Sequence, residues 1–162
     1  ITVADEQPVV ERIPYPAGAT APRATAFANR EGRPTVAAVA EGVGVWMLDT
    51  REKSWTLLPT PEPVVQATAV DDRDANLLAL TADGRVLVLD GETGALRAST
   101  AALVGASLAD GQPVALIADQ QRAYLSGPAE GLLWELDFAD DARVARVFTP
   151  ERTPLFAAET GR

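Results

Sequence analysis

The stretch that decides the fold is residues 67–100, which read ATAVDDRDANLLALTADGRVLVLDGETGALRAST. Short apolar runs alternate there with clusters of Asp, Asn and Gly, and we predict four strands, over 67–70, 76–81, 85–89 and 96–99. In the clusters, Asp side chains accept hydrogen bonds from the backbone just ahead and Gly takes positive φ, so each cluster predicts a tight hairpin connection. Four strands in roughly 40 residues is the size of one β-propeller blade.

The same pattern occurs three times along the chain. An aspartate ends the third predicted strand of each unit, at Asp49, Asp90 and Asp137. Aligning these residues predicts three blades, over 24–60, 67–100 and 113–150. The second strands, such as VAAVA in the first unit and NLLALT in the second, are almost continuously apolar. A strand has a continuously apolar sequence when both of its faces are buried, as they are where blades stack face to face.

Residues outside the three units indicate a larger assembly. PVVERIPY (8–15) reads like the fourth strand of a preceding blade, and PLFAAE (154–159) like the first strand of a following one. We therefore predict that residues 1–162 are a single all-β domain: three complete four-stranded β-propeller blades with partial strands at both ends, part of a larger closed propeller. Because propellers usually have four to eight blades, we expect the remaining blades from a second chain or a missing half of the protein. An isolated arc is expected to expose two broad apolar faces.

Composition excludes several classes of function. The net charge of −9 argues against a nucleic-acid partner, which needs a basic face. Without Cys or His, the chain has no disulfide, no Ser-His-Asp triad and no imidazole zinc ligand of its own. No apolar stretch is long enough to span a membrane. The chain begins at Ile1, so we expect that an upstream segment was removed.

The third unit resembles a known family of repeats. PVALIADQQRAYLSGPAEGLLWELDFADDARVARVFTP is similar to the YVTN repeats of bacterial propellers, and Arg122, Tyr124, Asp137 and Val147 fall on the positions of that pattern. This resemblance implies a β-propeller fold and says little about the ligand, since one fold serves many functions.

A second resemblance bears on function. The blade pattern and the terminal LFAAETGR (155–162) are similar to the periplasmic zinc metallochaperones that accompany zinc ABC transporters, and to their actinobacterial lipoprotein relatives. This resemblance implies a periplasmic or secreted protein, lipid-anchored through a removed N-terminus, with a transporter solute-binding protein as partner. That family binds zinc largely through His and carboxylates. Any His ligands would therefore lie outside this chain.

Three carboxylates are the candidate metal ligands. Glu41, Asp83 and Glu130 occupy the predicted turns between the second and third strands, which lie at the same end of stacked blades. Carboxylate oxygens suit calcium, and could complete a zinc site with His from elsewhere. The alternative is that acidic residues simply favour turns. The DDRD run (71–74) lacks the Gly and the distant Glu of an EF-hand loop, so we interpret it as a solvated turn.

The aromatic residues and the longest connection have their own interpretations. Trp46, Leu87 and Trp134 hold matching places in the three third strands, which predicts repeated packing between blades. Trp55 and Tyr15 are expected to make surface contacts, and Tyr15 lies in a Pro-rich connector, IPYPAGATAPR. Residues 101–112 form either a specialised loop or an ordinary connection between blades.

The function predicted from the sequence is a non-enzymatic, extracytoplasmic binding propeller for a metal ion, zinc or calcium, or for a protein partner. One alternative is a lactonase-like propeller enzyme with a carboxylate-bound metal. It would need Asn near the carboxylates, but Asn29 and Asn76 lie near the turns at the opposite end of the strands. The other alternative is a protein-interaction scaffold.

Overall fold

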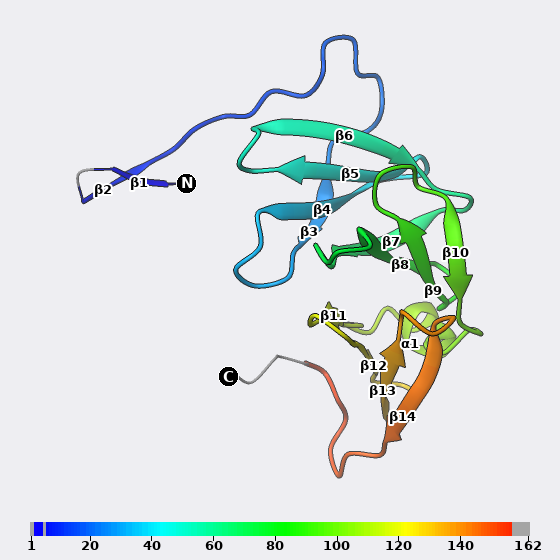
Figure 1. Ribbon diagram of the computed structural model, residues 1–162. Helices are drawn as coiled ribbons and strands as arrows, with labels where there is room; N and C mark the ends of the chain where they lie inside the picture. The colour runs from blue at the N-terminus through cyan, green and yellow to red at the C-terminus, as the bar shows by residue number, and fades with distance from the viewer. Residues whose placement is uncertain (1, 5, 157–162) are drawn as a thin grey trace.

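The computed structural model describes residues 2–4 and 6–156, and strands dominate it. Figure 1 shows three separate sheets that follow one another around an arc. Each sheet has four antiparallel strands in chain order, which is the topology of a propeller blade. The all-β prediction and the four-stranded blades are confirmed.

The three sheets are named blades 1, 2 and 3 in chain order. Blade 1 consists of β3 (Thr25–Ala28), β4 (Thr35–Ala40), β5 (Gly44–Asp49) and β6 (Ser54–Pro59). Blade 2 consists of β7 (Val64–Ala69), β8 (Asn76–Thr81), β9 (Val86–Asp90) and β10 (Leu96–Ser99). Blade 3 consists of β11 (Leu116–Ala118), β12 (Ala123–Gly127), β13 (Leu132–Asp137) and β14 (Arg143–Phe148). A short helix, α1 (Gly105–Ala109), lies in the connection between blades 2 and 3.

The ends of the chain differ from the prediction. β2 (Gln7–Val9) pairs with β1 (Thr2–Ala4) in a two-stranded hairpin that projects from the arc, so the strand predicted over 8–15 exists only at its start. Pro14 and Pro16, at the end of the predicted strand and just beyond it, have no N–H to donate to a ladder. At the other end, residues 154–156 belong to no strand, and the rest of the predicted strand over 154–159 lies outside the described residues.

Blade 2 is packed between its two neighbours. Every residue of β8 is buried. Leu77 and Ala79 join the core shared with blade 1, and the alternating Leu78 and Leu80 join the core shared with blade 3. Because successive side chains of a strand point to opposite faces, this alternation explains the continuous apolar run in the sequence.

The matching positions in the third strands all point to the same side of their blades. Leu87 packs in the core shared with blade 1, and Trp134 packs in the core shared with blade 2. We call this side of a blade its preceding face, and the opposite side its following face. The prediction of packing between blades is therefore confirmed for Leu87 and Trp134, whereas Trp46 packs against the chain's own N-terminal residues.

In blade 1 the preceding face is covered by the chain's own residues 11–24, which we call the strap. Trp46 is only 1% exposed there, and packs in a cluster with Tyr15 and Trp55. The expectation that Tyr15 and Trp55 make surface contacts is therefore wrong. Their rings stack on each other with centroids 4.8 Å apart, because the strap folds back on the sheet.

The following face of blade 3 is chemically unlike those of the other two blades. Cross-strand pairing places Tyr124 beside Glu135, where blade 1 has Ala37 beside Met47. The Glu135 side chain is only 12% exposed and forms ion pairs with Arg122 (3.5 Å) and Arg146 (3.9 Å). The two broad exposed apolar faces expected of an isolated arc are thus not observed. One face is covered, and the other carries charged and polar residues at its centre, with the apolar pair Leu133 and Phe148 at one end.

Candidate functional site

The three predicted metal ligands lie in equivalent turns. Glu41 follows β4, Asp83 lies between β8 and β9, and Glu130 lies between β12 and β13. Glu41 and Asp83 are exposed and Glu130 is half-buried. Among the described residues, no three acidic side chains come together in a group that could hold a metal ion.

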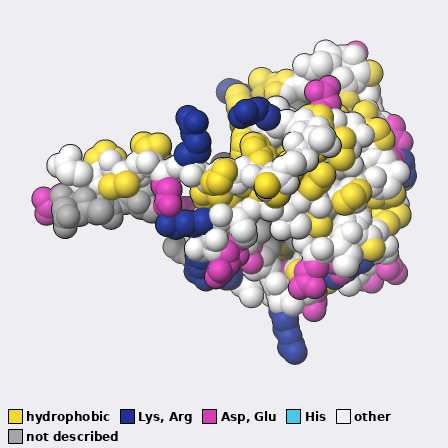
Figure 2. Space-filling model, turned by 90° about the horizontal axis from the view of Figure 1, so that it is seen from above, with side chains coloured by type: hydrophobic (Ala, Val, Ile, Leu, Met, Phe, Trp, Pro, Cys, Tyr) yellow, Lys and Arg dark blue, Asp and Glu magenta, His cyan; other side chains and the backbone are white. Residues whose placement is uncertain are grey.

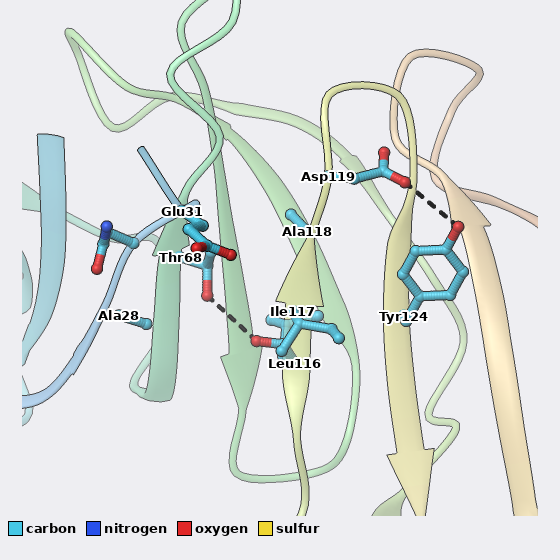
Figure 3. A pocket seen from close by; sticks show the side chains of 9 residues that line it. Ala28, Glu31, Thr68, Leu116, Ile117, Ala118, Asp119 and Tyr124 are labelled. Carbon is cyan, nitrogen blue, oxygen red and sulfur yellow. Dashed lines mark hydrogen bonds between the residues drawn. The ribbon is translucent and has the colours of Figure 1, made fainter. Parts of the chain in front are cut away.

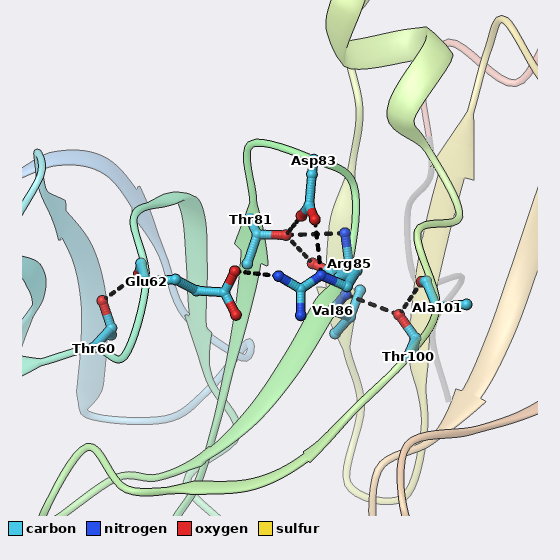
Figure 4. A network of polar contacts seen from close by, with 8 residues as sticks. All are labelled: Thr60, Glu62, Thr81, Asp83, Arg85, Val86, Thr100 and Ala101. Carbon is cyan, nitrogen blue, oxygen red and sulfur yellow. Dashed lines mark hydrogen bonds and ion pairs between the residues drawn. The ribbon is translucent and has the colours of Figure 1, made fainter.

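Asp83 belongs to a network of polar contacts within and beside blade 2 (Figure 4). Its carboxylate accepts hydrogen bonds from the Thr81 hydroxyl and from Nε of Arg85 (2.9 Å). The hydrogen bond from Thr81, and then that from Arg85, hold the pKa of Asp83 below its usual value. Arg85 also pairs with Glu62, in the connection that leads into β7. Asp83 therefore anchors its own turn.

Glu130 is engaged by the helix in the long connection. One of its oxygens accepts the backbone N–H groups of Ala106 (3.0 Å) and Ser107 (3.2 Å), and the other accepts the Ser107 hydroxyl. Burial raises the pKa of Glu130, but the hydrogen bonds from Ser107 and Ala106 outweigh it and lower the pKa overall. Val104, the residue before α1, makes no side-chain hydrogen bond to the helix, and Glu130 of blade 3 supplies the cap instead.

The connection over residues 101–112 therefore joins two blades. The Leu103 N–H donates to the carbonyl of Gly84 in blade 2 (2.8 Å), while Glu130 of blade 3 caps α1. Gly84 has φ +90°, and a Cβ there would lie 2.5 Å from the backbone nitrogen of Gly105, so a side chain would push the connection away. Two of the three predicted ligands are thus held in structural contacts, and metal binding by this set stays a prediction.

The structure reveals a different candidate site, at the opposite end of the strands. A pocket of about 270 Å³ is lined by residues of all three blades (Figure 3). Its apolar part comes mainly from β11, with Ala28 of β3, and blade 2 contributes Thr68 of β7. Its polar residues lie in or beside the turns between first and second strands, or in β12: Asn29, Glu31, Asp119 and Tyr124. We call this set the channel pocket, because the first strands of propeller blades line the central channel.

Hydrogen bonds fix the shape of the channel pocket. The Thr68 hydroxyl donates to the Leu116 carbonyl (3.2 Å), which joins the first strands of blades 2 and 3. Asp119 caps its own turn by accepting the N–H groups of Gln121 and Arg122 (both 2.7 Å), and its other oxygen accepts the Tyr124 hydroxyl (3.3 Å). Burial, together with the negative charge of Asp119, raises the pKa of Tyr124.

Blades 1 and 2 are tied together beside this pocket. Arg30 is only 4% exposed, and its guanidinium donates to the Val70 carbonyl (3.0 Å). Asn29 forms a parallel bridge with Ala69 just next to it. The sequence offered one signal for this site, the polar residues in the turns between first and second strands, but turns of that composition are ordinary. Only the fold shows that these turns converge.

On the face seen in Figure 2, acidic and basic side chains lie in small separate groups. Among the described residues, no helix is long and apolar enough to cross a membrane.

No protein-family model and no curated protein matches this sequence. Among solved structures, the chain is similar to apo AztD from Citrobacter koseri, with a TM-score of 0.73 and 16% identity over 94% of this chain. It is also similar to BamB from Moraxella catarrhalis (TM-score 0.54, 15% identity, 75% of this chain and 35% of that one). The WD40 β-propeller domain of Doa1 gives a TM-score of 0.52 with 14% identity over 74% of this chain and 38% of that one.

These sheets are blades of a β-propeller. At such identities the similarity shows the fold alone, and the likeness to YVTN repeats stays a resemblance. The chain spans 42% of the length of AztD, so it corresponds to part of that protein.

Proposed function

We propose that this chain is part of a non-enzymatic, extracytoplasmic binding propeller, and that the channel pocket is its share of the ligand site. The observation that carries this proposal is that all three blades contribute to one pocket. Further blades, from a second chain or from another part of the same protein, would supply the rest of the site.

The ligand that we propose is a divalent metal ion. The resemblance to periplasmic zinc metallochaperones supports zinc. The described residues do not fit a zinc site by themselves, because the chain has neither His nor Cys and gathers no three acidic side chains. Zinc would therefore need His ligands from outside the chain, whereas calcium could bind to oxygen ligands alone. The periplasmic location and the solute-binding partner rest on the same resemblance.

Calorimetry with zinc or calcium, together with native mass spectrometry, tests the position of the site. Glu31 in the channel pocket and Glu41 at the other end of blade 1 form a matched pair, since both are exposed glutamates next to β4. We expect the chain alone to bind with a Kd on the order of 10⁻⁴ M or weaker, as carboxylate sites of few ligands do. Glu31→Gln should weaken binding several-fold and Glu41→Gln should not. Binding that depends on Glu41 and ignores Glu31 would contradict the proposal.

A further inference from the structure

The strap lies on an aromatic groove of blade 1. The groove is the preceding face of that blade, where the large side chains are Trp46, Trp55 and Leu57, with the small Ala38 and Ala40 between them. The strap, ERIPYPAGATAPRA, contains three prolines and belongs to no helix or strand. A turn closed by the Ala19 N–H and the Pro16 carbonyl (3.1 Å) is its one hydrogen bond between residues of the strap backbone among those that the structure describes.

The contacts between strap and groove are directed at the strap backbone. The indole N–H of Trp46 donates to the Pro22 carbonyl (2.7 Å), and that of Trp55 donates to the Ile13 carbonyl (3.1 Å). Tyr15 lies between them, with its ring centroid 4.9 Å from that of Trp46. Its hydroxyl accepts the Ala24 N–H (2.9 Å).

This is the chemistry by which aromatic grooves bind proline-rich segments. Proline leaves carbonyls without a neighbouring N–H, so the segment forms little structure of its own and its carbonyls are open to indole donors. Stacked aromatic rings supply the apolar contact at the same time. A pocket of about 380 Å³ lies beside this contact, between the strap at 18–22 and Val43, Trp46 and Leu57.

The strap is also held by few side chains. Only Ile13, Tyr15, Ala21 and Ala24 are half-buried, and its other residues are exposed. The one ion pair of the strap among the described residues, Glu11 with Lys53 (2.9 Å), joins two side chains that are about half exposed (48% and 56%), and such pairs contribute little.

We propose that this groove is a docking site for an extended, proline-containing segment of a partner protein, and that the strap occupies it as a competing segment of the same chain. In the partner segment, the two indole N–H groups would bind backbone carbonyls spaced like those of Ile13 and Pro22. An aromatic side chain of the segment would lie between these carbonyls. The inference is independent of the channel pocket and of any metal.

The experiment uses the full chain and a synthetic peptide of residues 11–24. Tyr15→Ala removes the central ring of the strap and leaves the groove intact. We expect this variant to bind the peptide at least tenfold more tightly than the unchanged chain, with a blue shift of tryptophan fluorescence. A peptide with the same Tyr→Ala change should bind at least tenfold more weakly. Tyr124→Ala, the same substitution in blade 3, is the matched control and should behave like the unchanged chain.

A second variant, Ala21→Asp, places a charge on the inner side of the strap and also leaves the groove unchanged. Equal peptide affinity for the unchanged chain, Tyr15→Ala and Ala21→Asp would overturn the proposal. So would peptide binding to Tyr15→Ala that survives when Trp46 and Trp55 are both replaced by Phe. A dimer of the unchanged chain that is lost in Tyr15→Ala would assign the groove to a second copy and overturn the assignment to a partner protein.

Discussion

The two outward faces of the arc are opposites. The preceding face of blade 1 is aromatic and is covered by the strap, so that Trp46 is buried although no blade precedes it among the described residues. The following face of blade 3 has no such cover from the described residues. Instead it carries Tyr124 and Glu135, where blade 1 has Ala37 and Met47 and blade 2 has Leu78 and Val88.

This difference shows that the three blades are not interchangeable repeats. Blade 2 meets both neighbours through aliphatic side chains, whereas a neighbour packed on blade 3 would have to pair with the Tyr124 hydroxyl and with charged groups. Buried charges are costly unless they are paired, so such a neighbour would be chosen by its polar groups more than by shape.

The largest effect is expected on the covered face. Trp46→Ala should lower the free energy of unfolding by about 3–5 kcal/mol, because it removes a buried indole and leaves a cavity beneath the strap. Urea unfolding measures the loss. Val147→Ala in β14, where the side chain is 52% exposed, is the control and should change stability by about 0.5 kcal/mol or less. Equal effects of the two substitutions would show that the strap does not cover Trp46.

The next effect compares equivalent turns of blades 1 and 3. Glu130→Ala should cost about 1–3 kcal/mol, because α1 loses the acceptor of three hydrogen bonds. Glu41→Ala removes an exposed carboxylate with no hydrogen bond among the described residues, and should cost less than about 0.5 kcal/mol. Both are read from urea unfolding. If Glu41→Ala proved the more costly, the structural role assigned to Glu130 would be wrong.

A third change converts the open face into that of blade 2. Replacing Tyr124 by Leu and Glu135 by Val gives blade 3 the cross-strand pair that blade 2 has at the equivalent positions, Leu78 and Val88. We expect the self-association constant, measured by sedimentation velocity, to rise at least tenfold, because an exposed apolar sheet face favours association. Glu92→Val places the same residue in an exposed turn and should have no such effect. Equal self-association of the double variant and the unchanged chain would mean that Tyr124 and Glu135 do not keep this face soluble.

The smallest effect is a dependence on pH. Because the pKa of Tyr124 is raised in the folded protein, its contribution to stability is present below its ordinary value of 10.0 and is lost as the pH rises through the folded pKa. Above pH 10, the free energy of unfolding should therefore fall less steeply with rising pH in Tyr124→Phe than in the unchanged chain. Parallel curves would show that the phenol is not desolvated beside Asp119.

The sequence predicted the blades because their signals are local. In blade 2 the observed β8 coincides with the predicted strand over 76–81, and the anchor Asp90 accepts the N–H groups of Glu92 and Thr93, as a turn-forming Asp should. These hydrogen bonds, the one from Thr93 first, lower the pKa of Asp90 to about 2. The alternation of apolar residues and turns is sufficient to find such elements.

The candidate site was harder to predict because it depends on contacts between distant residues. Glu130 reads like an ordinary turn carboxylate, and only the fold brings Ser107 to it. The channel pocket likewise joins Glu31 to Asp119 across three blades, with no shared motif in the sequence. The strap reads as a connector because proline-rich segments commonly are, and the indole donors that hold it come from β5 and β6.

Hydroxyl-radical footprinting tests the central difference between the two faces most directly, because it reports the exposure of individual side chains. Relative to the unfolded chain, Trp46 (1% exposed) should be strongly protected, while Phe148 of β14 (39% exposed) should be labelled readily. Removing the ring of Tyr15 should raise the labelling of Trp46 and leave Phe148 unchanged. Equal protection of Trp46 and Phe148 in the unchanged chain would contradict the account of one covered and one open face.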